Sequence, residues 1–205
     1  IKSHYNLIKD LGLKPLVLDY QPNAIAKLIN YADTINSRYP IRKITFAAID
    51  IGYDNTKVSI IDDGVLQVSR VIGIGGKYID QSILNFYKYT YEELQEIKEQ
   101  IEDISHIDER KEEISRVASI VKDSFGTLNE KIEIIFRYYI TREVGNRIHT
   151  ILLYGGGANI AGLSNLFSNY FGIPSIKLES IDGVTFQGDI ARYINPIGTI
   201  LRTEV

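Results

Sequence analysis

A strand that ends in a short polar turn and leads directly into a second strand most constrains what this chain can fold into. Ile44–Ile49 is apolar and rich in β-forming residues, and Asp50 stands at its end. Gly52 lacks the Cβ that would keep a ligand from the backbone, and Asn55 and Thr56 add short polar side chains beside backbone N–H groups. The pattern is typical of a phosphate-binding turn. An ordinary β-hairpin, in which Asp50 and Asn55 serve only the turn, is the alternative.

Three consecutive glycines form a second turn of this kind. The apolar run Ile151–Tyr154 leads into Gly155, Gly156 and Gly157, followed by Ala158 and a helical pattern. Three glycines carry a high entropic cost, so another group must approach this backbone closely. That group is either a ligand or a neighbouring element packed tightly on the turn. The spacing fits neither the dinucleotide-binding fingerprint nor the lysine-containing phosphate loop.

The first half of the chain predicts a helix followed by an antiparallel meander. Asp62-Asp63-Gly64 is a strong hairpin signal between the last two strands of that meander. The expected elements are a strand at Leu16–Asp19, a helix at Pro22–Arg38, and strands at Ile44–Asp50, Lys57–Ile61 and Leu66–Ile72.

The second half predicts mostly helices around the glycine turn. Thr90 and Glu93 have the spacing of a capping box. The charged stretch Glu102–Glu113 indicates a solvated helix or an excursion from the core. The expected elements are helices at Gly75–Tyr89, Tyr91–Ile101 and Leu128–Ile148, the strand from Ile151, a helix to Tyr170, a strand at Ser175–Leu178 and a final helix from Asp189.

Composition excludes several classes of protein and of site. The formal net charge is −3 over 205 residues, and no basic stripe offsets it, which argues against nucleic acid as a ligand. The absence of cysteine excludes disulfides and thiolate metal sites, and it fits a cytoplasmic protein. His4, His106 and His149 are too scattered to predict a metal cluster. No apolar run reaches the ~20 residues that cross a bilayer, so any membrane role is expected to pass through a partner.

The two turns together resemble the actin-like ATPase superfamily, which implies an α/β, ribonuclease H-like lobe with a mixed sheet, helices on both faces and a small inserted subdomain. The resemblance implies ATP and Mg²⁺ as ligands. Gly52 to Thr56 would face the β and γ phosphates, and Gly155 to Ala158 would lie against the adenosine. Asp50 would hold Mg²⁺ through water, and we expect it to have few protein partners of its own.

The segment Glu93–Lys98 resembles the superfamily helix that reaches the nucleoside. Gln95 and Lys98 would contact the ribose and base, with Gln95 standing where the superfamily often has Glu. The segment from Gln21 to Ala26 resembles the first helix that connects the two lobes, and Ile197–Leu201 resembles the closing one.

Within the superfamily the chain most resembles the PilM family of type IV pilus assembly proteins. Its features are Leu11-Gly12-Leu13-Lys14-Pro15, the segment Arg70–Gly76 with Gly75 and Gly76, and the end motif from Asn195 to Arg202. The resemblance implies a cytoplasmic scaffold, peripheral to the inner membrane, that recruits the cytoplasmic tail of a PilN-like inner-membrane partner and self-associates. ATP would be structural or regulatory, with at most weak hydrolysis. An FtsA-like cell-division filament protein and a sugar-kinase-type phosphotransferase are the alternatives.

The superfamily uses two phosphate hairpins, one in each lobe, and this chain contains only the second. We therefore expect a fragment in which residues 1–40 are the end of the first lobe and a connecting helix. Residues 41–205 would form the second lobe, with an insertion subdomain at about 77–125.

Overall fold

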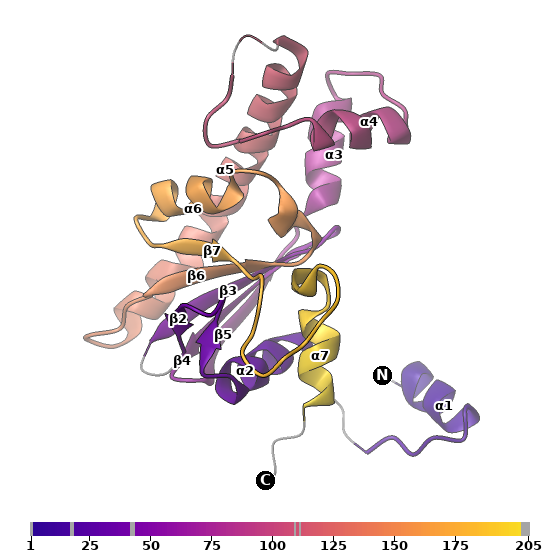
Figure 1. The fold of residues 1–205 in the computed structure, drawn as a ribbon, viewed down its shortest axis with the longest axis vertical. Helices are drawn as coiled ribbons and strands as arrows, with labels where there is room; N and C mark the ends of the chain where they lie inside the picture. Colours follow the sequence, from indigo (N-terminus) through magenta and orange to yellow (C-terminus); the bar gives the residue numbers. More distant parts are fainter. Residues whose placement is uncertain (1, 17–18, 42–43, 109, 111, 202–205) are drawn as a thin grey trace.

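The computed structural model describes residues 2–16, 19–41, 44–108, 110 and 112–201. A five-stranded mixed sheet with the strand order β5-β4-β3-β6-β7 lies at its centre (Figure 1). β3 pairs antiparallel with β4 and parallel with β6, so the meander and the glycine-turn strand meet at β3. The strands are β1 (Thr34–Ile35), β2 (Tyr39–Pro40), β3 (Thr45–Ile51), β4 (Thr56–Asp62), β5 (Val65–Ile72), β6 (Thr150–Tyr154) and β7 (Ser175–Lys177).

Helices cover both faces of this sheet. Alternate residues of the central strand β3 enter two separate cores, with Ile49 and Ile51 on one face and Phe46 and Ala48 on the other. The first core includes side chains of α3 to α6, and the second includes those of α2 and α7. The helices are α1 (Lys2–Asp10), α2 (Gln21–Tyr31), α3 (Gly76–Leu84), α4 (Tyr91–Glu99), α5 (Glu112–Arg142), α6 (Leu163–Phe171) and α7 (Ile194–Ile200), with short 3₁₀ turns η1 (Gly156–Asn159) and η2 (Ile190–Arg192).

The predicted α/β fold and the predicted meander are confirmed. The turn between β4 and β5 has Asp63 at φ 45° and Gly64 at φ 78°, the left-handed pair that a two-residue hairpin requires. The capping box is also present, because Thr90 Oγ1 accepts from the N–H of Glu93 while the Glu93 carboxylate accepts from the N–H of Thr90.

The predicted helix at Pro22–Arg38 is wrong in its second half, since α2 ends at Tyr31. A small hairpin, β1–β2, follows instead, and Asn36 at φ 52° forms its turn. The Asn36 amide accepts from the N–H groups of Glu179 and Ser180 and donates to the carbonyl of Lys177. A distant loop therefore stabilises this turn, which the local pattern could not reveal.

The helix boundaries in the second half also need correction. The predicted helix at Leu128–Ile148 is α5, which begins far earlier, at Glu112, and ends at Arg142. Its early turns bury Val117 and Val121 against α3 and α4, so burial rather than local charge sets its start. The expected solvated stretch is mostly a loop, and the predicted helix at Gly75–Tyr89 ends at Leu84.

Three further differences lie near the ends of the chain. The predicted final helix is divided into η2 and α7. The expected strand at Leu16–Asp19 includes Val17 and Leu18, which are outside the described residues. The helix α1, which we did not predict, buries none of its residues and lies apart from the sheet in Figure 1. Within the described part of the chain, no helix has the length and apolarity needed to cross a membrane.

The two segments that resemble connecting helices pack directly on each other. A Cβ added at Gly198 of α7 would overlap the carbonyl group of Ala24 in α2, so glycine permits this close crossing. Lys27 Nζ donates to the carbonyl of Leu201 at 2.9 Å and pairs with Asp19. The pair α2 and α7 thus forms one unit on the second face of the sheet.

We expect His149 to make stability depend on pH. Its Nδ1 accepts from the N–H of Thr45 at 2.9 Å, and burial, with Arg147 nearby, lowers its pKa. The unfolded chain then takes up this proton first, so the contribution to stability is complete above pH ~6.5 and is lost as the pH falls below it. Thermal unfolding at pH 7.5 and 5.5 should show a larger decrease for the wild type than for His149→Asn, which keeps an acceptor that does not titrate. Equal decreases would contradict this role.

Candidate functional site

An open pocket of about 600 Å³ lies beside the carboxyl end of β3. The turn after β3, the helices α3 and α4, the glycine turn η1 and the short helix η2 all contribute to its lining. Of the residues predicted from the sequence, those in the lining are Gly52, Gly76, Gln95, Lys98, Gly156 and Gly157. Those outside the lining are Asp50, Asn55, Thr56, Gly75, Gly155 and Ala158.

The turn after β3 is held against the beginning of α3. The N–H of Gly76 donates to the carbonyl of Gly52 at 3.0 Å, and the N–H of Lys77 donates to that of Tyr53 at 2.8 Å. A Cβ on Gly75 would lie 2.5 Å from both carbonyl oxygens, so Gly75 is required for packing. Gly52 and Gly76 then form one continuous floor of backbone at the pocket.

The two polar side chains of this turn differ in their surroundings. Thr56 is fully buried, and its Oγ1 donates to the carbonyl of Ile74 at 2.7 Å, so its hydroxyl ties β4 to the segment before α3. Asn55 Oδ1 is buried and has no hydrogen-bond partner within the described residues. An unpartnered buried acceptor is costly, and Asn55 is therefore the turn side chain with unused hydrogen-bonding capacity.

Asp50 has more protein partners than we expected, and that expectation is corrected. It is 6% exposed, its Oδ2 accepts from Asn195 Nδ2 at 2.9 Å, and Lys57 Nζ lies 4.0 Å from the same oxygen. Burial and the Asp50 carboxylate together raise the pKa of the neighbouring Tyr154. The sequence missed Asn195 because 145 residues separate it from Asp50.

The helix α4 forms one wall of the pocket and places Gln95 and Lys98 in it. Lys98 Nζ lies 2.6 Å from Oδ1 of Asp80, a buried carboxylate on α3 that sequence reasoning missed. This ion pair joins α3 to α4 and restricts the ammonium group to the pocket wall. Lys98 has further N–H donors beyond the one that Asp80 accepts.

The three glycines of the turn after β6 have different roles. Gly155 has φ 84°, and a Cβ there would lie 2.5 Å from Asp50 Oδ1, while one on Gly157 would overlap the side chain of Ile51. These two glycines therefore permit the turn to pack on β3. A Cβ on Gly156 would meet nothing within 4 Å, so this backbone faces the open pocket. Ala158 is buried beneath the turn.

Several lining residues came from no sequence pattern. Tyr53 and Tyr91 are 55% and 65% exposed and contribute aromatic surface from the hairpin and from α4. Asn159 and Arg192 line the glycine side, and both bind the Asp189 carboxylate, at 2.5 and 3.2 Å. The (i, i+3) spacing of Asp189 and Arg192 could have predicted their ion pair from the sequence. Only the fold, however, places the pair beside the glycine turn.

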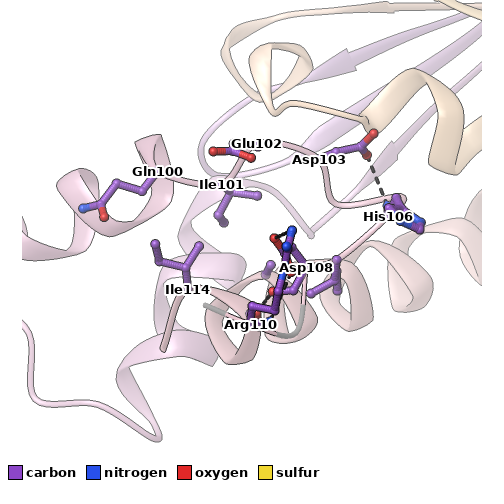
Figure 2. Close-up of a pocket in the computed structure, with 11 residues that line it drawn as sticks. Gln100, Ile101, Glu102, Asp103, His106, Asp108, Arg110 and Ile114 are labelled. Carbon is purple, nitrogen blue, oxygen red and sulfur yellow. Dashed lines mark hydrogen bonds and ion pairs between the residues drawn. The ribbon is translucent and has the colours of Figure 1, made fainter. Parts of the chain in front are cut away.

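A second hollow of about 400 Å³ lies next to this pocket, between the end of α4 and the beginning of α5 (Figure 2). Several of its polar groups bind one another. Asp103 Oδ1 accepts from the N–H groups of Ser105 and His106, and both oxygens of Asp108 accept from Arg110. We assign no ligand to it. Within the described ranges, no cluster of three His, Asp or Glu side chains could hold a metal ion.

Comparison with protein families gives one match, over residues 1–194, to the family described as type IV pilus assembly protein PilM. Comparison with curated protein sequences gives none.

The fold is similar to several solved structures. A PilM-PilN type IV pilus biogenesis complex matches with TM-score 0.69 and 17% identity over 96% of this chain and 55% of that one. MreB5 of Spiroplasma citri bound to ADP matches with TM-score 0.68 and 20% identity over 97% of this chain and 63% of that one. The ethanolamine utilization protein EutJ from Carboxydothermus hydrogenoformans matches with TM-score 0.63 and 20% identity over 96% and 58%. These likenesses establish the actin-like fold, and the chain spans less than two thirds of each structure.

We expect Asp50 and Asn195 to stabilise the fold as a pair. Replacement of Asp50 by Ala leaves the Asn195 amide without its acceptor, so the free energy of unfolding should fall by about 1–3 kcal/mol without any ligand. Asn195→Ala should cost a similar amount, and the double variant should cost clearly less than the sum. Urea denaturation of the four proteins measures this, and strictly additive losses would contradict the pairing.

Proposed function

This chain belongs to the PilM family of type IV pilus assembly proteins, and on that premise we propose that it is part of an ATP-binding cytoplasmic scaffold of pilus assembly. The nucleotide would occupy the pocket between α4 and the glycine turn. The single observation that carries this proposal is the open space beside Gly156. At the neighbouring Gly155 and Gly157, residues of β3 occupy the space where a Cβ would lie.

The pocket suits a nucleotide in size and chemistry. Its volume of about 600 Å³ is in the range of small-molecule sites, and aromatic, amide and ammonium groups converge on it. Gln95 and Lys98 would bind the nucleoside part from α4, and the backbone of Gly156 and Gly157 would lie against it from the other side. The phosphates would extend toward Gly52 and Gly76, where backbone is accessible.

The same residues fit magnesium less completely. Mg²⁺ is usually held by one or two carboxylates, waters and the phosphates of a nucleotide. Asp50 could supply one carboxylate through water, although Asn195 already occupies one of its oxygens. We therefore propose that the phosphates of the nucleotide would provide most of the protein-independent ligands of Mg²⁺, with Asp50 acting only through water.

The nucleotide is proposed to act more as a clamp than as a fuel. Its pocket joins five elements, the β3 turn, α3, α4, η1 and η2, so a bound nucleotide would hold them together. We propose the same division of the chain as above, with residues 1–40 as the end of a first lobe, 41–205 as the second lobe and an insertion at about 77–125.

The proposed partner is the cytoplasmic tail of a PilN-like inner-membrane protein, which would bring the scaffold to the inner face of the membrane. The similarity to a chain of a PilM-PilN complex supports this choice. Family membership favours this assignment over a cell-division filament protein or a sugar kinase. Self-association of the scaffold stays a prediction.

Gly156→Val tests the pocket directly. The Cβ of a valine at this position would meet no protein atom within 4 Å, and its side chain would project into the space proposed for the nucleotide. The ATP dissociation constant should therefore rise at least about tenfold with little change in thermal stability. Gly126→Val on α5, which also meets nothing within 4 Å, is the matched control and should leave binding unchanged. Gly157→Val should instead lower the melting temperature, because it overlaps Ile51. Normal ATP binding by a folded Gly156→Val protein would contradict the proposed site.

The affinity of the 205-residue chain itself should be modest. On the proposed division of the chain it would contain one of the two phosphate hairpins of the superfamily, and each charge-assisted hydrogen bond from the other hairpin would be worth about 1.5–3 kcal/mol. Titration calorimetry with ATP and Mg²⁺ should therefore give a dissociation constant no better than the high micromolar range, roughly 100 µM or above. A submicromolar value would show that this chain holds the nucleotide alone.

A further inference from the structure

The helix α5 has more apolar surface than the sheet beneath it covers. Ile132, Phe136 and Tyr139 are buried in the core. Ile134 and Tyr138, four residues apart and so on one side of the helix, are 66% and 53% exposed. The sheet thus leaves part of the apolar surface of α5 uncovered.

The exposed side of α5 lies beside β5, which is an edge strand of the sheet. This strand is the last in the order β5-β4-β3-β6-β7, and within the described residues its outer edge has no backbone hydrogen bond to another element. Val71 on this strand is 65% exposed. A hollow of about 370 Å³ lies between β5 and α5, lined by Arg70, Val71, Ile134, Ile135 and Tyr138.

The charged residue that lines this hollow is Arg70. The Arg70 guanidinium lies over the ring of Tyr138, 5.9 Å from its centroid, and donates to the carbonyl of Ser69. It forms no ion pair with any carboxylate of the described chain. The strand Val65–Ile72 contains no acidic residue.

We propose that the outer edge of β5 is a docking site for an extended, acidic segment of another protein, which adds a sixth strand to the sheet. Its backbone would pair with β5, its apolar side chains would cover Ile134 and Tyr138, and a carboxylate beside them would pair with Arg70. This surface is distinct from the nucleotide pocket and does not depend on it.

The charges decide against a second copy of this chain as the occupant. Antiparallel pairing of β5 with another β5 would bring two Arg70 side chains onto one face with no acid between them. The other edge strand, Ser175–Lys177, carries a lysine and is only three residues long. A different protein with an acidic strand satisfies both the charge and the apolar surface.

The test uses the capped peptide Thr-Val-Thr-Glu-Thr-Val-Thr, which places Val, Glu and Val on one face of a strand. One matched peptide has Lys in place of Glu, and another is N-methylated at alternate residues, which removes backbone donors. Amide NMR shifts of the full 205-residue chain report binding, with β5 as the expected site and β7 as the internal control. Arg70→Glu, an exposed substitution, is titrated with the same peptides after its melting temperature is measured.

The Glu peptide should shift β5 amides at high micromolar to millimolar concentrations, and the Lys peptide should bind about three- to tenfold more weakly. Arg70→Glu should reverse this order, and N-methylation should abolish binding. The absence of β5 shifts with either charged peptide, or equal binding of the N-methylated peptide, would overturn the proposal. Sedimentation of the chain as a dimer that Ser69→Pro converts to a monomer would also overturn it, because the occupant would then be a second copy.

Discussion

The packing of Ile51 on the glycine turn is the contact on which the rest of the site depends. β3 and β6 run parallel and end together, with Asp50 beside Tyr154 in the register. Their turns would separate if either glycine next to Ile51 carried a side chain. Because Gly155 and Gly157 admit β3 so closely, Gly156 is left facing outward between them, and a turn from residue 52 and a turn from residue 156 line one pocket.

The closing segment of the chain is attached to both turns. Asn195 on α7 binds Asp50 below the first turn, and the N–H of Gly155 donates to the carbonyl of Ala191 at 2.9 Å. The same helix crosses α2 at Gly198, where only a glycine fits. A displacement of η2 and α7 would therefore be transmitted to both turns through these short contacts.

The sequence was most reliable where local chemistry decides structure. Alternating apolar residues, the Asp63-Gly64 turn and the capping box at Thr90 each act within a few residues, and each was found as predicted. Prediction failed where a distant contact decides. A hairpin replaces the second half of the predicted helix at Pro22–Arg38, and a loop near residue 180 binds the amide of its turn residue Asn36. The helix α5 extends to Glu112 because other helices bury its early turns. The likeness to the superfamily predicted some residues that line the pocket, such as Gly52 and Gly156, but not Asp80, Asn159 or Arg192.

The sequence by itself determined the strands of the central sheet, the two turns and the need for glycine in both, because hydrophobic periodicity and the cost of consecutive glycines are local properties. Only the tertiary structure decided what each residue of the turns does. Residues of β3 occupy the space where a Cβ of Gly155 or Gly157 would lie, whereas the space beside Gly156 is open. Thr56 donates to the carbonyl of Ile74, and Asp50 accepts from Asn195. The physical reason is that the role of a side chain, or of a glycine without one, depends on which atoms lie opposite it. The packing of segments distant in sequence decides which atoms those are.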